Sequence, residues 1–120
     1  MGHKINWQIQ GTYNDGSELG SKPREALFAL LEPHMKNWTF FIGEDAEAGY
    51  ICEFSTNKWC PIQEALTIFA EKYPDVRLFV TYRYDNAWNP DGLITKDGEL
   101  LEITGKIVYT LDATGEEVSF

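Results

Sequence analysis

Cys60 is the residue whose type and position could most directly do chemistry in this sequence. It precedes Pro61 where a strand-like pattern gives way to a helical one, and Lys58 lies two residues earlier. A helix N-terminus and a nearby cation both favour the thiolate form of cysteine. Catalysis also needs a base, and the one credible histidine is His34, after the first predicted helix. The predicted order of strands and helices gives no reason for His34 to lie near Cys60. We therefore interpret Cys60 as a structural residue beside a helix cap, with Trp59 packing over the apolar layer.

The many carboxylates do not by themselves indicate acid–base catalysis. Glu44, Asp45 and Glu47 share one polar segment, while Glu116 and Glu117 are adjacent near the end of the sequence. General acid–base catalysis needs a carboxyl group whose pKa is raised inside a cleft. The sequence marks no such cleft, so we expect these side chains to be solvated.

The candidate ligand residues do not have the spacing that known metal-binding and cofactor-binding motifs require. If Gly92 took the sixth position of an EF-hand loop, positions one and twelve would be Ala87 and Gly98, which cannot act as side-chain ligands. Cys52 and Cys60, with two scattered histidines, do not form a zinc-binding spacing and are expected to be free thiols. The glycine-rich phosphate-binding patterns are also absent. We therefore predict no metal, no cofactor and no enzymatic activity.

The charge of the chain limits the partners it can bind. The 120 residues carry a formal net charge of −9, and residues 85–120 contain eight acidic side chains against two lysines. Because phosphate contacts come from Lys and Arg, we predict no direct binding to nucleic acid or to an anionic membrane surface. The segment RLFVTYRY also lacks the glycine of an RNA-recognition motif. No apolar run approaches the roughly 18 residues of a membrane helix, and no secretory signal is visible, which predicts a cytoplasmic protein.

Apolar residues recur at the spacing of four strands and two helices. Strict alternation is typical of a strand with one buried face, and it occurs over residues 4–10, 38–42, 50–54 and 76–84. Helical stripes predict one helix that Ser21 caps and Pro33 ends, and a second from Pro61 that Pro74 ends.

The order βαββαβ predicts an α+β, ferredoxin-like fold, in which two helices cover one face of an antiparallel sheet. This core would span about residues 4–84 of a single domain over residues 1–120. Beyond it, Asp97-Gly98 suits a type I′ turn, and the segment DATG suits a second turn. We expect the resulting hairpin strands, over about residues 92–120, to extend the sheet.

The stretch from Cys52 to Glu102 resembles a known family, the YubB-type ferredoxin-like domains of phage, plasmid and bacterial proteins of unknown function. The resemblance is carried by EFST at a strand end, a Trp and a Pro before a helix, KYPDV at the helix end, LFVTYRY in the next strand and a KDGEL hairpin. It implies the same fold and an origin in phage or another mobile element. It implies no catalytic residues.

Exposed aromatic residues are the strongest candidates for a binding surface. Trp59 and Trp88 fall in predicted loops, with Asp91 in the turn after Trp88, and Phe41 and Phe79 point to the sheet face away from the helices. Aromatic side chains at a polar rim often mark protein interfaces. The alternative is that C-terminal strands or a partner subunit, for example in a homodimer, cover them.

Two functional hypotheses remain open from the sequence. The first is a small non-enzymatic protein-interaction module that acts through its open sheet face or its aromatic loops. The second is an acidic mimic of nucleic acid, of the anti-defence type, whose C-terminal carboxylates imitate phosphates and inhibit a nucleic-acid-binding protein. Binding by a mimic would weaken steeply as the salt concentration rises.

Overall fold

The computed structural model describes residues 4–40, 49–84, 91–104, 108–110, 113–115 and 117–119. Phe41 and Trp88, together with Glu44, Asp45, Glu47 and Glu116, lie outside the described residues. In chain order, the elements are β1 (Ile5–Tyr13), α1 (Ser21–Leu31), the short 3-10 helix η1 (Glu32–His34), β2 (Lys36–Phe40), β3 (Tyr50–Thr56), α2 (Cys60–Lys72), β4 (Val76–Tyr84), β5 (Asp91–Lys96), β6 (Glu99–Thr104), β7 (Val108–Thr110) and β8 (Glu117–Ser119).

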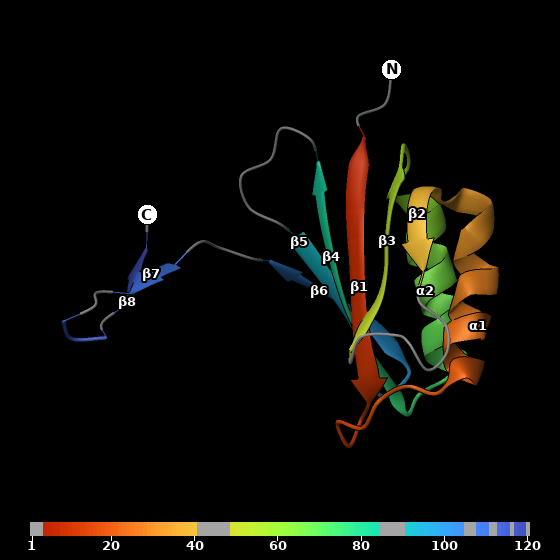
Figure 1. Cartoon of the computed structure of the whole chain (residues 1–120), viewed down its shortest axis with the longest axis horizontal. Helices are drawn as coiled ribbons and strands as arrows, with labels where there is room; N and C mark the ends of the chain where they lie inside the picture. The colour runs from red at the N-terminus through yellow and green to blue at the C-terminus, as the bar shows by residue number, and fades with distance from the viewer. Residues whose placement is uncertain are drawn as a thin grey trace.

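Six of the strands form one antiparallel sheet in the order β2-β3-β1-β4-β5-β6. The first four strands in this order, with α1 and α2, make the βαββαβ arrangement predicted from the sequence. Both α-helices cover the same face of the sheet, and none of the described residues forms a helix over the opposite face (Figure 1). The predicted ferredoxin-like α+β fold is therefore confirmed.

The core lies between the helices and the covered face of the sheet. Alternate residues of β1, namely Ile5, Trp7 and Ile9, are buried, while the residues between them are exposed. Leu66 and Phe69 of α2 belong to the same buried cluster, as does Val80 of β4. The apolar stripes of the sequence thus meet in one dry interior, as their periodicity predicts.

Helix α1 departs from its prediction in two respects. Its N-cap is Gly20 with no side-chain cap hydrogen bond, so Ser21 is the first helical residue and not the predicted cap. Its buried face also contains Arg24, whose guanidinium donates from Nε to the Leu19 carbonyl at 3.2 Å and from Nη1 to the Tyr50 carbonyl at 2.8 Å. These bonds satisfy donors that burial would otherwise leave without water.

The C-terminal strands extend the sheet only in part. β5 and β6 add to the β4 edge, and Asp97 and Gly98 join them with the positive φ angles, 53° and 82°, that a type I′ turn requires. β7 and β8 form the second predicted hairpin, but they pair only with each other. The expectation that this last hairpin extends the sheet is therefore wrong. None of the three described helices has the length and apolar character that crossing a membrane would require.

Candidate functional site: the open face of the sheet

Strand alternation gives the uncovered face of the sheet, here called the open face, a polar half and an apolar half. Paired residues lie in rows across the strands. The register gives three such rows: Ser55, Asn6 and Arg83; Glu53, Gln8 and Thr81; and Gln10, Phe79, Ile94 and Leu101. The first two rows are polar, and the third becomes apolar as it crosses from β1 to β6.

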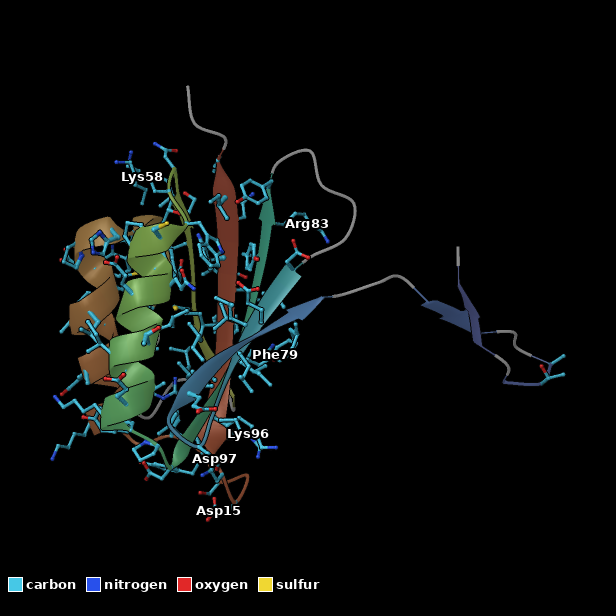
Figure 2. All side chains as sticks on the ribbon, turned by 180° about the vertical axis from the view of Figure 1, so that it is seen from behind. Asp15, Lys58, Phe79, Arg83, Lys96 and Asp97 are labelled. Atoms are coloured by element: carbon cyan, nitrogen blue, oxygen red, sulfur yellow. The ribbon has the colours of Figure 1, made fainter. Side chains whose placement is uncertain are left out.

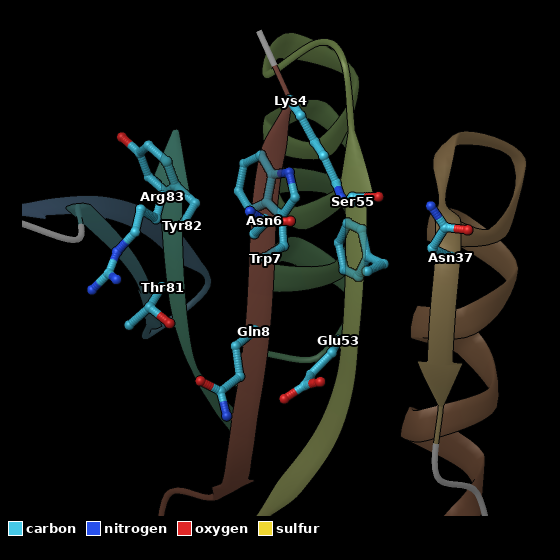
Figure 3. A pocket seen from close by; sticks show the side chains of 11 residues that line it. Lys4, Asn6, Trp7, Gln8, Asn37, Glu53, Ser55, Thr81, Tyr82 and Arg83 are labelled. Carbon is cyan, nitrogen blue, oxygen red and sulfur yellow. The ribbon is translucent and has the colours of Figure 1, made fainter. Parts of the chain in front are cut away.

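The polar half contains an open groove with a volume of about 700 Å³. Its side chains come from β1, β2, β3 and β4 and include Lys4, Asn37, Glu53 and Arg83 (Figure 3). Trp7, Phe54 and Tyr82 also line the groove, although alternation directs their side chains to the helix side. The groove therefore offers hydrogen-bond donors and acceptors of several kinds, together with charges of both signs.

The apolar half, here called the apolar patch, consists of Phe79, Ile94, Leu101 and Ile103. Phe79 is 45% exposed and Leu101 is 41% exposed, while Ile94 and Ile103 are half-buried. Ile103 lies directly over Gly92, because a Cβ added to Gly92 would lie 2.7 Å from Ile103 Cγ1. Gly92 thus lets the Ile103 side chain lie close to the backbone of β5.

The open face is basic although the chain is acidic. Its described strands, with Lys4 directly before β1, carry Lys4, Arg77, Arg83 and Lys96 against Glu53 and Glu99, all of them exposed. Arg83, Phe79 and Lys96 point away from the helices (Figure 2). Since the whole chain has a net charge of −9, the excess of negative charge lies elsewhere on the molecule.

The structure divides the candidate residues predicted from the sequence between two places. Phe79 lies on the open face, as predicted. Trp59 and Asp91 lie on the helix side, where both flank Tyr82: the rings of Trp59 and Tyr82 are 6.2 Å apart, and Asp91 pairs with Tyr82 across β4 and β5. They do not join Phe79 in one surface, and Phe41 and Trp88 cannot be placed because they are outside the described residues.

Tyr82 has a perturbed phenol. Its burial raises the pKa above the ordinary value, and the negative charge of Asp91 raises it further, while the Trp59 indole opposes part of the rise. Tyr82 also contacts Trp7, with ring centroids 5.0 Å apart. The aromatic contacts fix the ring, so we assign this cluster a packing role at the end of the core.

The two cysteines differ in environment. Cys60 is exposed and is the first residue of α2. Trp59 is the N-cap residue of this helix and packs against the core. This matches the predicted position of Cys60 beside the cap. Cys52 is buried, and burial raises the pKa of its thiol far above the ordinary value, with the charge of Glu53 adding to the rise. Both cysteines are free, as predicted.

His34 lies nearer to the start of α2 than the sequence suggests. It lines a cavity of about 210 Å³ together with Lys36, Thr56, Asn57, Lys58 and Pro61. The fold therefore brings His34 near this helix end, which the predicted order of elements gave no reason to expect. Cys60 does not line the cavity. Within the parts of the chain that the structure describes, no group of His, Cys, Asp and Glu is arranged to hold a metal ion.

Sequence reasoning missed most of the apolar patch. Ile94, Leu101 and Ile103 are ordinary strand residues when taken one at a time, and Phe79 alone stood out as a ring on the open side. The missing signal was the register: once Asp97-Gly98 is taken as the turn, residues 94 and 101 must lie opposite each other.

Comparison with known proteins gives no match: no family model, no curated protein and no solved structure is significantly similar to this chain. The resemblance to YubB-type domains therefore stays a prediction from the sequence.

Proposed function

We propose that the protein is a non-enzymatic interaction module that binds an acidic polypeptide segment on the open face of its sheet. One observation carries the proposal: the apolar patch and the basic, polar groove adjoin on a face that no helix covers, in a chain whose net charge is −9. The patch would bury apolar side chains of the partner, and Lys4, Arg77, Arg83 and Lys96 would attract its carboxylates.

The central strands favour a polypeptide over a nucleic acid. In sheets of this topology that bind RNA, aromatic rings on the sheet face stack on bases. Here the corresponding face of β1 presents Asn6, Gln8 and Gln10, that of β3 presents Glu53, and that of β4 presents Thr81. Amides and hydroxyls suit the main chain of a peptide, while Glu53 would repel phosphates.

A photo-reactive side chain on the open face tests the proposal. Phe79→benzoylphenylalanine should cross-link to a polypeptide in the native host, because Phe79 is the most exposed residue of the apolar patch. Ile68 of α2 is a matched control, since it is 52% exposed on the opposite layer, whereas Phe79 is 45% exposed. Cross-linking at Phe79 but not at Ile68 would support the proposal. No cross-link at Phe79, or equal cross-linking at both positions, would overturn it.

The acidic mimic is the second candidate, and the β5–β6 hairpin is the feature that favours it. Four carboxylates, those of Asp91, Asp97, Glu99 and Glu102, are exposed on this hairpin. If the mimic is correct, Asp97→Lys with Glu102→Lys should abolish capture of a nucleic-acid-binding protein, and capture should fall steeply with salt. The interaction module should keep its partner in this variant. A cytoplasmic location and an origin in a mobile element belong to either hypothesis and stay predictions.

A further inference from the structure

The C-terminal hairpin stands apart from the body of the protein. Within the described residues, β7 and β8 pair as strands only with each other, and Figure 1 shows them at a distance from both helices and from the six-stranded sheet. The Cα radius of gyration is 15.5 Å, whereas a compact domain of this length is expected at about 14 Å. The hairpin thus makes the molecule more extended than a compact domain of the same length.

A hairpin of this size is not stable without a surface to pack on. Each of its strands, Val108–Thr110 and Glu117–Ser119, has three residues. Isolated two-stranded hairpins are marginal in water even when they are longer. The sequence of this segment is also rich in apolar residues: residues 105–120 include Ile107, Val108, Tyr109, Leu111, Val118 and Phe120. Apolar side chains are stabilised when binding removes them from water.

The chemistry of the segment matches the open face. Residues 105–120 carry Asp112, Glu116 and Glu117 against Lys106, so the segment is acidic as well as apolar. The apolar patch is flanked by Arg77 and Lys96, which are both exposed. The hairpin is therefore an acidic, apolar polypeptide of the kind that the proposed function requires.

We infer that the open face binds the β7–β8 hairpin of a second copy of this chain, in a reciprocal dimer. The inference rests on the proposed function and names its partner. Figure 1 shows the hairpin of one copy at a distance from its own six-stranded sheet, whereas a second copy can receive the hairpin where it stands. A two-fold arrangement gives each copy one donated and one received hairpin, so the assembly closes at two copies.

Charge reversal on both surfaces tests the inference. The face variant is Arg77→Glu with Lys96→Glu, and the hairpin variant is Glu116→Lys with Glu117→Lys. The wild-type chain should sediment as a dimer, and each variant alone should dimerise about ten-fold more weakly, because each places like charges together. Mixed in equal amounts, the two variants should form heterodimers, in which both contacts again join opposite charges. Lys22→Glu, on the exposed side of α1, is the control and should leave the dimer unchanged.

The outcomes separate the inference from the proposed function. A monomeric wild-type chain, or variants that fail to recover association on mixing while circular dichroism shows both folded, would overturn the hairpin exchange. If Phe79→benzoylphenylalanine still cross-links to another polypeptide in that case, the interaction module stands and only its partner is wrong. If no polypeptide cross-links at Phe79 either, both proposals are overturned. A cross-link whose peptides map to residues 105–120 of a second copy would support both.

Discussion

The two faces of the sheet are built from the same strands but differ in exposure, charge and apolar content. On the helix side, Trp7 and Val80 are buried in a continuous apolar cluster. On the open side, their neighbours Gln8 and Phe79 are exposed. Strand alternation alone produces this division, because adjacent residues point to opposite faces. Apolar residues on the helix side therefore form the core, whereas Phe79 on the open side is not part of it.

The largest expected difference between the faces is in stability. Phe69→Ala should lower the free energy of unfolding by about 3–5 kcal/mol, because it removes a fully buried ring from the core. Phe79→Ala should lower the free energy of unfolding by less than about 1 kcal/mol, since Phe79 is already 45% exposed. Urea titration followed by circular dichroism measures both changes. Equal losses would mean that Phe79 is a core residue and that the open face is covered.

A buried hydrogen bond on the helix side gives the next largest effect. Trp7 Nε1 donates to Thr56 Oγ1 at 2.9 Å, and both residues are buried. Thr56→Val should lower the free energy of unfolding by about 1–3 kcal/mol, because the indole N–H loses its acceptor. Thr67→Val on the exposed side of α2 is the control and should stay within about 0.5 kcal/mol of wild type. A loss no larger than that of the control would show that water reaches Trp7.

Two glycine positions allow the tightness of packing on the two faces of the sheet to be compared. A Cβ added to Gly11 would lie 2.7 Å from Leu78 Cδ2, and one added to Gly92 would lie 2.7 Å from Ile103 Cγ1. Leu78 is fully buried and cannot move aside, so Gly11→Ala should cost about 1–3 kcal/mol in unfolding free energy. Ile103 is half-buried and can turn outward, so Gly92→Ala should cost less. Thermal unfolding of the two variants makes the comparison, and a larger loss for Gly92→Ala would contradict it.

The smallest effect concerns pH at the end of the core. Because burial raises the pKa of Tyr82, the folded state holds this proton to higher pH than the unfolded state, whose phenols titrate near about 10. Stability contributed by the protonated phenol is therefore present below about pH 10 and is lost as the pH rises through the folded pKa. Asp91→Asn should lower the pKa of Tyr82 in an absorbance titration. An unchanged titration would mean that the carboxylate does not act on the phenol.

The sequence was sufficient to predict the fold because the periodicity of apolar residues indicates which side of each strand or helix is buried. The alternation of Ile5, Trp7 and Ile9 and the helical stripe from Ile62 to Tyr73 each identify one buried face, and one antiparallel sheet with two helices satisfies them together. Arg24 was missed because a charged side chain gives no sign of burial when its partners are backbone carbonyls 26 residues away, such as that of Tyr50.

The open face could be predicted only in fragments. Phe79 was identified because it is a ring on the polar side of its strand, but its neighbours Ile94 and Leu101 come from another hairpin and meet it only through the register of three strands. Likewise, the basic character of this face is hidden in a sequence whose total charge is −9. Composition sums charges over the whole surface, whereas recognition depends on how they are distributed.

Hydroxyl-radical footprinting of the two faces in one sample tests most directly whether the open face binds a polypeptide. Oxidation of Phe79 and Ile68 would be compared between the dilute purified chain and the same chain at high concentration or in extract of the native host. We expect Phe79 to become protected from oxidation as the open face is occupied, while the oxidation rate of Ile68 on α2 stays the same. Unchanged oxidation of Phe79 under all conditions, or protection of Ile68 in its place, would contradict it.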